Sequence, residues 1–294
     1  RSVSRGLGDV YKRQNIYHTI KVTNHQNVSH DLMPIHLGWC EGEVINYAAR
    51  SCQVQFIAHG QTRLITVNQM RSTTSTQGNC TFYEWGRKDP LRPSSGYAYK
   101  NKTWYNAAGI ASTANHAVES FPFGNECIKN YIRKPDVMQK EIGGDNTYFN
   151  LWNADNNTNS NVYNDNPVTK TVYDPCPVGF AMPPSNTFTG FTTTGENVTN
   201  TVAKYNGEWN SSLPGWNFYC GPNKTGGTIF FPMTGERISS GGHLSAVGSL
   251  GHTWSATSTH SNYAHNLTLY TNYWVWPLDR FSKSAGHGVR PCLE

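Results

Sequence analysis

The stretch 251–294 reads GHTWSATSTHSNYAHNLTLYTNYWVWPLDRFSKSAGHGVRPCLE, and it decides the fold. From His265 to Trp276 the side chains alternate between two sets, and many of them are β-branched or aromatic. This period of two is typical of a β-strand. One face of the predicted strand carries Leu267, Leu269, Thr271, Tyr273 and Val275, and the other carries Thr268, Tyr270, Asn272, Trp274 and Trp276.

A second stretch is expected to meet the end of the chain. It reads YDPCPVGF (173–180), and Pro183 and Pro184 follow it at the start of a predicted short helix. We expect the terminal strands to return to the turn around Cys176, and the rest of the domain to be built on this closure.

Several separated blocks resemble, in the same order, the Fibrobacter succinogenes major paralogous domain family. They are FYEWGRKDP (82–90), YDPCPVGF (173–180), IFFPMTG (229–235), GSLGHTWSA (248–256) and the final VRPC (289–292). The resemblance covers residues 82–294 and is weak over 15–81. It implies an α+β, mostly β fold similar to C-type lectins, with short helices and long loops. It also implies a secreted or surface protein of gut bacteria, fimbrial or lipoprotein, and it brings no catalytic residues.

Residues 1–14, RSVSRGLGDVYKRQ, resemble one reading frame of the transposase end sequence used to fragment DNA for sequencing. The alternative is a natural basic arm. Because this segment holds four basic residues and one acidic residue, its removal lowers the formal net charge from +5 to +2. A nucleic-acid partner then has little support. We expect a fragment whose native N-terminus is missing, with residues 15–294 as one domain; a separate small domain at 15–75 is the alternative.

Local patterns predict the remaining elements. A helix is expected at 126–134, with Cys127, Ile128, Tyr131 and Ile132 on one face. An Asn-rich loop is expected at 155–167, and glycine-rich turns at 241–251. Strands are predicted at 16–23, 145–152 and 228–232, together with a hairpin of 52–57 and 62–67 around 58–61.

Trp85 and Gly86 belong to a block, WGRKDP, that could be a functional site because Arg, Lys and Asp follow a Trp. We interpret it instead as a buried turn, in which Trp85 packs inward and Arg87 or Lys88 pairs with a carboxylate. The Asn-rich loop offers oxygen ligands for calcium, but the regular helix–loop spacing is absent and turn chemistry explains the composition. The Glu-Pro-Asn and Trp-Asn-Asp triplets of sugar-binding C-type lectins are also absent.

Signatures of catalysis and of metal binding are not found. The chain has seven cysteines without a C-x-x-C pair, and no G-x-S-x-G or H-E-x-x-H motif. Four histidines, His252, His260, His265 and His287, lie in the C-terminal quarter and could meet around a metal ion. We interpret them as exposed or as hydrogen-bonded in the core. The sequence therefore predicts no enzyme, no metal and no cofactor.

The residues and the resemblance together favour a non-enzymatic recognition or adhesion module on the bacterial surface. An enzyme that acts on surface glycans or peptides, and a purely structural fimbrial subunit, are the alternatives. The ligand would be a glycan or a protein, and other fimbrial subunits are possible partners. Tyr270, Trp274 and Trp276 are the candidate ligand-binding residues, because aromatic residues dominate binding hot spots; the alternative is that a loop covers them.

The same resemblance predicts the residues that hold the structure. It places Cys176 beside Cys292, and C-type lectins commonly tie an early helix to the last strand with a disulfide. Two free, buried thiols are the alternative. Trp85, Gly86, Trp254 and Arg290 are expected to be structural.

Overall fold

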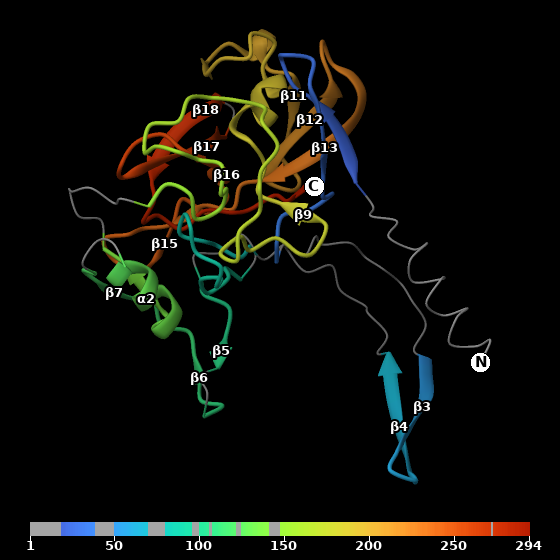
Figure 1. The fold of residues 1–294 in the computed structure, drawn as a ribbon. Coiled ribbons are helices and arrows are strands. Elements are labelled where there is room, and N and C mark those ends of the chain that lie inside the picture. The colour runs from blue at the N-terminus through green and yellow to red at the C-terminus, as the bar shows by residue number, and fades with distance from the viewer. Residues whose placement is uncertain are drawn as a thin grey trace.

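The computed structural model describes residues 19–38, 50–69, 80–95, 100–105, 108–121, 125–140, 148–271 and 273–294. Over these ranges the chain is mostly β (Figure 1), so the prediction of a mostly β, α+β fold is confirmed at this level. Its described helices are α2 (Asn125–Arg133) and two 3₁₀ helices, η1 (Ser185–Phe191) and η2 (Val202–Lys204). Residues 1–14 lie outside the described ranges.

The end of the chain pairs with an early and a middle segment. Strand β19 (Cys292–Leu293) lies between β2 (Ser29–Leu32) and β9 (Phe180–Ala181), and β1 (Ile20–Thr23) completes this four-stranded sheet. Cys292 pairs with Leu32 on one side and with Ala181 on the other. Because β9 directly follows the turn at Cys176, the predicted return of the terminal strand to this turn is confirmed.

The strand predicted from His265 to Trp276 is wrong as a single element, because one strand ends at Tyr270 and an antiparallel strand begins at Trp274. It forms β17 (Tyr263–Tyr270) and β18 (Trp274–Ser282), in a four-stranded sheet with β16 (Leu250–Ser258) and β10 (Val198–Thr199). Leu269 pairs with Val275 across this hairpin. Next to the turn, odd-numbered residues thus oppose odd-numbered residues, and the two predicted faces are retained there; the register shifts between Asn266 and Thr268.

The largest core cluster lies under η1 and the third sheet. This sheet contains β11 (Gly207–Asn210), β12 (Gly215–Gly221) and β13 (Thr225–Pro232), which includes the strand predicted at 228–232. Phe191 of η1 stacks on Phe218 with ring centroids 4.1 Å apart, and both contact Phe231 edge-on. Leu267, Leu269 and Val275 belong to the same cluster, so these three odd-numbered residues of β17 and β18 are core.

A second core cluster is built around tryptophans, and it confirms the predicted buried turn for Trp85 to Arg87, whereas residues 88–90 are exposed. Trp85 is 1% exposed, and Gly86 adopts φ +86°, a conformation that favours glycine. The Arg87 guanidinium lies 2.5 Å from the Glu84 carboxylate, with both side chains buried. Trp152 packs against Trp85 at 5.4 Å between ring centroids. Residues 148–152 hold no strand, so the prediction of a strand there is wrong in its described part.

The remaining described strands form two-stranded sheets. The predicted hairpin is confirmed as β3 (Arg50–Ala58) and β4 (Gln61–Gln69), joined by His59 and Gly60 at φ +53° and +75°. It stands away from the rest of the described chain (Figure 1), and its described side chains are exposed. The other pairs are β5 (Trp104–Tyr105) with β6 (Ala111–Ser112), β7 (Ala117–Glu119) with β8 (Val137–Gln139), and β14 (Glu236–Arg237) with β15 (Leu244–Ser245).

Helix α2 occupies the predicted position, but its buried face is narrower than expected. Cys127 and Tyr131, one turn apart, are buried against Phe121 and Val137. Ile132 is 63% exposed, so its placement on the buried face is wrong. Only one narrow side of this short helix packs against the rest of the protein, and residues four positions apart, i and i+4, lie on that side. Within the described ranges, no helix is both long and apolar enough to cross a bilayer.

Cys176 and Cys292 are free, buried thiols, so the disulfide implied by the resemblance is not formed. The pairing of β19 with β9 places Cys292 opposite Ala181, whereas Cys176 lies in the preceding turn. The two residues consequently belong to different core clusters. Burial raises the pKa of the Cys292 thiol to about 12 and also raises that of Cys176.

Arg290 holds the end of the chain to two distant segments. Its guanidinium is buried, donates to the backbone carbonyls of Met33 (2.9 Å) and Phe230, and lies 4.3 Å from the centre of the Phe231 ring. These contacts fit the structural role expected of Arg290.

Candidate functional site

The face of the β16–β17–β18 sheet opposite to the Leu267 core carries both polar and aromatic side chains. His252 of β16 pairs with Thr268 of β17, which pairs in turn with Trp276 of β18. Directly paired residues point to the same side of a sheet. Tyr270 and Trp274 occupy the next row on this side, at the end of the hairpin. We call this side the polar–aromatic face.

Tyr270, Trp274 and Trp276 form an aromatic cluster on this face. The two indoles stack with centroids 4.8 Å apart and planes 3° from parallel, and the Tyr270 ring meets Trp274 edge-on at 4.3 Å. All three side chains are half-buried. The three predicted ligand-binding residues are thus brought together, and neither tryptophan is enclosed in the core.

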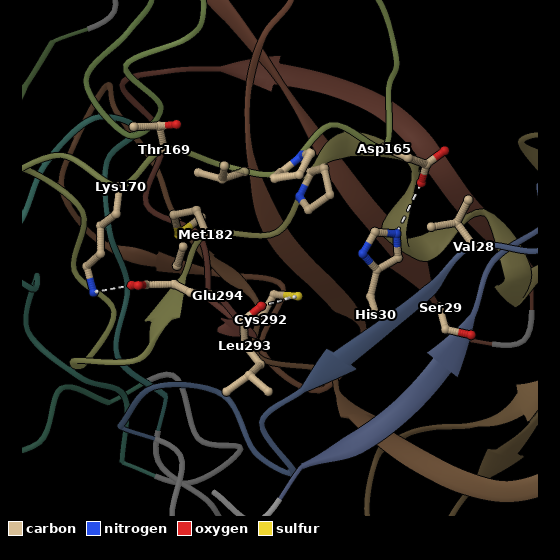
Figure 2. A pocket seen from close by; sticks show the side chains of 14 residues that line it. Val28, Ser29, His30, Asp165, Thr169, Lys170, Met182, Cys292, Leu293 and Glu294 are labelled. Atoms are coloured by element: carbon tan, nitrogen blue, oxygen red, sulfur yellow. Dashed lines mark hydrogen bonds and ion pairs between the residues drawn. The ribbon is translucent and has the colours of Figure 1, made fainter. Parts of the chain in front are cut away.

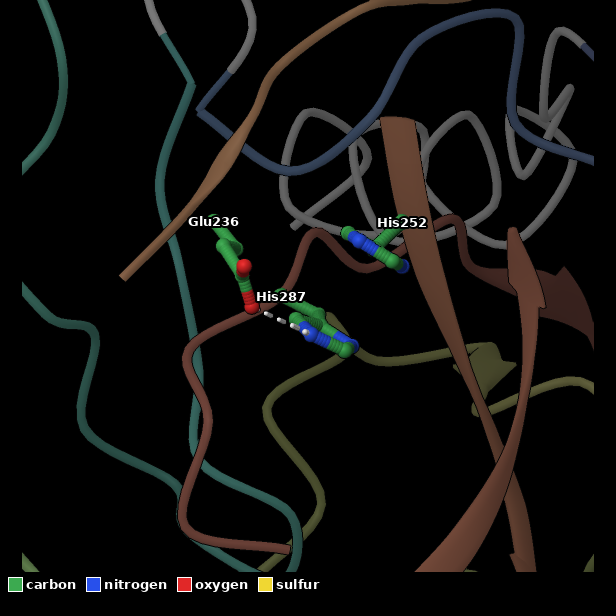
Figure 3. A group of neighbouring side chains, drawn as sticks. All are labelled: Glu236, His252 and His287. Carbon is green, nitrogen blue, oxygen red and sulfur yellow. Dashed lines mark ion pairs between the residues drawn. The ribbon is translucent and has the colours of Figure 1, made fainter. Parts of the chain in front are cut away.

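Beside the aromatic cluster lies a His–His–Glu cluster, which consists of His252, His287 and Glu236 (Figure 3). One potential ligand atom from each residue lies within 4.8 Å of the others. The two imidazole rings stack with centroids 4.2 Å apart, and the Glu236 carboxylate lies 3.7 Å from Nε2 of His287. Both histidines are buried, whereas 14% of the Glu236 side chain is exposed.

Short backbone contacts place Glu236 between the two histidines. Gly235 bridges to Gly251, which precedes His252, and Arg237 bridges to Gly286, which precedes His287. A Cβ at 251 would lie 2.8 Å from the carbonyl oxygen of Pro232, and one at 286 would lie 2.9 Å from Arg237 Cβ. Glycine is required at both places because the segments approach so closely.

A hydrogen-bonded chain connects His252 with the acidic group at the other side of the face. Nδ1 of His252 lies 3.0 Å from the Thr268 hydroxyl, which accepts a hydrogen bond from Asn266 Nδ2 at 2.8 Å. The same hydroxyl hydrogen-bonds the carboxylate of Asp279. A proton on His252 Nδ1 lets the imidazole donate to Thr268 and the hydroxyl donate to Asp279, whereas the 3.3 Å contact from Asn266 Nδ2 to the same nitrogen needs the other tautomer, in which Nδ1 accepts.

The buried polar atoms without a hydrogen-bond partner gather at this face. The described part of the chain has twelve such side-chain atoms, and five of them belong to four residues here. They are Trp276 Nε1, His252 Nε2, Asn266 Oδ1 and both ring nitrogens of His287. Because buried polar groups are nearly always hydrogen-bonded, such a concentration indicates a place where something else binds.

Burial also sets the protonation state of the titratable side chains on this face. It lowers the pKa of His287 and of His252 well below the ordinary value, and for His252 the neighbouring His287 adds to the effect. Both rings are therefore neutral near pH 7 and offer lone pairs. Burial also raises the pKa of Tyr270, with smaller contributions from the carboxylates of Asp279 and Glu236.

A cavity of about 600 Å³ elsewhere in the molecule is a weaker candidate (Figure 2). Its acidic group, Asp165, lies 3.1 Å from His30 Nε2 and accepts a hydrogen bond from Asn186. Lys170 donates to three backbone carbonyls and lies 3.8 Å from the Glu294 carboxylate. The charged groups that line this cavity are engaged in holding neighbouring segments together.

The sequence identified only part of the polar–aromatic face. His252 and His287 do come together, whereas His260 and His265 lie outside the cluster. The interpretation of these histidines as exposed or satisfied is wrong for His252 and His287, since three of their four ring nitrogens have no partner among the described residues. Glu236 was missed. No spacing marks it, because its approach depends on backbone contacts between segments distant in sequence.

Comparison of the chain with protein-family models, with curated proteins and with solved structures found no match in any of the three.

Proposed function

We propose that this protein is a non-enzymatic recognition or adhesion module on a bacterial cell surface, which binds a glycan at the aromatic cluster. The observation that carries the proposal is the stacked, half-buried pair Trp274 and Trp276, in which Nε1 of Trp276 has no hydrogen-bond partner among the described residues. The sequence blocks that resemble the major paralogous domain family support the surface location and a C-type-lectin-like fold.

The chemistry of the cluster suits a sugar better than a purely apolar ligand. One side of a pyranose ring presents C–H groups that pack on an aromatic face, while its hydroxyls need donors and acceptors. Trp276 Nε1–H is a free donor among the described residues, and the carboxylate of Asp279 is a nearby acceptor. The aromatic rings supply contact area at low cost in side-chain entropy.

The test is a glycan array, run together with a panel of host matrix proteins and a general hydrolase screen. We expect binding to a limited set of glycans without turnover. Trp276→Ala should weaken binding at least ten-fold, about 1.4 kcal/mol. Tyr273→Ala is the matched control, because Tyr273 lies in the same turn but is exposed and outside the cluster. Binding to matrix proteins alone would show that the ligand is a protein and not a glycan. Turnover of a screened substrate would favour the enzyme alternative.

The structural-subunit alternative has one observation in its favour. The β3–β4 hairpin exposes several apolar side chains, including Phe56 (54%), Ile57 (71%) and Leu64 (63%). A two-stranded hairpin with an exposed apolar surface is a site at which another chain can add. If this alternative holds, the protein should self-associate through the hairpin in sedimentation experiments, and the glycan array should be blank.

A further inference from the structure

We infer that His252, His287 and Glu236 form a binding site for a divalent transition-metal ion of the Zn²⁺ class. The inference is independent of the glycan proposal, because it rests on the His–His–Glu cluster and not on the aromatic cluster.

The first argument is that the three residues converge without bonding to one another. The 3.7 Å between the Glu236 carboxylate and His287 Nε2 is too long for a hydrogen bond, and His287 has no other hydrogen-bond partner among the described residues. Three potential ligand atoms within 4.8 Å of each other leave room for an ion between them. On a tetrahedral zinc ion with bonds of about 2.0–2.1 Å, ligand atoms lie about 3.3 Å apart. Because the two imidazole planes are 11° from parallel, at least one ring must rotate before both lone pairs point at one ion.

The second argument is the hydrogen bonding of His252, which holds one ring nitrogen and leaves the other for a ligand. Its Nδ1 is tied to the Thr268 hydroxyl, which is itself held by Asn266 and Asp279. Its Nε2 is buried and has no partner in the described structure. A ligating histidine characteristically has one nitrogen hydrogen-bonded to an orienting group, while the other nitrogen binds the metal.

The third argument is the surroundings of the rings. Trp254 stacks on His287 with centroids 4.2 Å apart, and Phe281 meets both imidazoles at 4.7 and 5.0 Å. These contacts surround the imidazoles with an apolar environment. The partly exposed Glu236 side chain provides the route to solvent.

The donor set selects the class of ion. Two imidazoles and one carboxylate suit Zn²⁺ and its neighbours Co²⁺, Ni²⁺ and Fe²⁺, whereas Ca²⁺ and Mg²⁺ prefer a shell of oxygen ligands. Three protein ligands leave one coordination position for water or for an oxygen of a bound molecule.

The test uses the full chain without a histidine tag, stripped with a chelator and titrated with Zn²⁺ and Co²⁺. We expect one equivalent of Zn²⁺ to bind, and a Co²⁺ absorption spectrum of nitrogen and oxygen ligation without thiolate charge transfer. Glu236→Gln and His287→Gln should each weaken Zn²⁺ binding at least ten-fold, while the exposed-histidine controls His260→Gln and His243→Gln should leave it unchanged.

Circular dichroism of each variant shows whether it folds. Glu236→Gln keeps the test valid if His287→Gln does not fold, because the Glu236 side chain lies at the edge of the buried cluster. Two results would overturn the inference: no saturable Zn²⁺ binding to the wild-type chain, or binding that Glu236→Gln leaves unchanged. Neither result depends on the outcome of the glycan array.

Discussion

Trp85 and Trp254 each donate an indole N–H to the backbone beside the other residue. Trp85 Nε1 donates to the carbonyl of Ser255 at 3.0 Å, and Trp254 Nε1 donates to the carbonyl of Tyr83 at 2.8 Å. Both side chains are fully buried. This exchange joins the FYEWGRKDP block to the C-terminal stretch, so that two segments far apart in sequence fold as one unit.

Loss of one of these bonds should destabilise the fold. Trp254→Phe keeps a ring beside His287 but leaves the buried carbonyl of Tyr83 without this donor. We expect the free energy of unfolding in urea to fall by about 2–4 kcal/mol, from the lost hydrogen bond and the lost ring volume. The control is Trp209→Phe, at a partly buried indole, where we expect a loss below about 1.5 kcal/mol. Equal losses in the two variants would show that the reciprocal bonds add nothing specific.

Gly86 is predicted to be irreplaceable for two separate reasons. Its φ of +86° strains any other residue, and a Cβ there would lie 2.5 Å from Leu151 Cδ1. We expect Gly86→Ala to cost about 2–4 kcal/mol of unfolding free energy. Gly109→Ala is the matched control, because Gly109 has φ +75° but open space around its Cβ, so only the conformational cost of about 1–2 kcal/mol remains. Equal losses of unfolding free energy in Gly86→Ala and Gly109→Ala would contradict the predicted steric clash at Gly86.

Lys283 is predicted to make the stability depend on pH. Burial lowers the pKa of its ammonium group to about 7, where Nζ donates to the Tyr148 carbonyl and lies 4.8 Å from the centre of the Trp85 ring. Between pH 7 and the ordinary lysine pKa of 10.5, the unfolded chain binds more protons at this position. The contribution of Lys283 to stability therefore rises with pH and is lost as pH falls through 7, by at most about 1.4 kcal/mol per pH unit.

Urea unfolding of the wild type and of Lys283→Met at pH 7, 8 and 9 measures this contribution. We expect the difference in unfolding free energy to shift in favour of the wild type as pH rises. Lys129→Met, at an exposed lysine, should give a difference that does not change. Parallel pH profiles of the wild type and Lys283→Met would show that the buried amine does not titrate in this range.

Cys176 and Cys292 should behave as protected thiols in the native protein. Both are buried and unbonded, and burial raises the pKa of each, so little thiolate is available. In thiol-labelling experiments, the half-buried Cys220 should react before the other four described cysteines, and Cys176 and Cys292 only after unfolding. A cross-linked peptide that joins Cys176 to Cys292 in a non-reducing map of the native protein would contradict this.

The parts of the fold that depend on local pattern could be predicted from the sequence. The alternation through Leu267, Leu269 and Val275 placed these residues correctly on the core face, because cross-strand pairing follows the same period. The His59–Gly60 hairpin and the turn at Gly86 were also predictable, since their backbone angles favour particular residues.

Features that depend on contacts between distant segments could not be predicted in this way. The turn between Tyr270 and Trp274 was missed because the alternation of side chains in the sequence continues through it. Glu236 was missed because its place beside His252 results from the bridge between Gly235 and Gly251. The absence of a bond between Cys176 and Cys292 follows from the register of β19 against β9, which no spacing in the sequence encodes.

The central claim is that the aromatic cluster binds a ligand, and the indole N–H resonance of Trp276 tests it most directly. Two-dimensional NMR of the ¹⁵N-labelled protein, with Trp276 assigned through Trp276→Phe, follows this group while the glycan identified on the array is added. The account predicts that the Trp276 Nε1–H signal shifts saturably. The signals of Trp85 and Trp254 should stay in place, because their N–H groups already donate to backbone carbonyls. A Trp276 signal that does not move while the glycan binds would contradict the account.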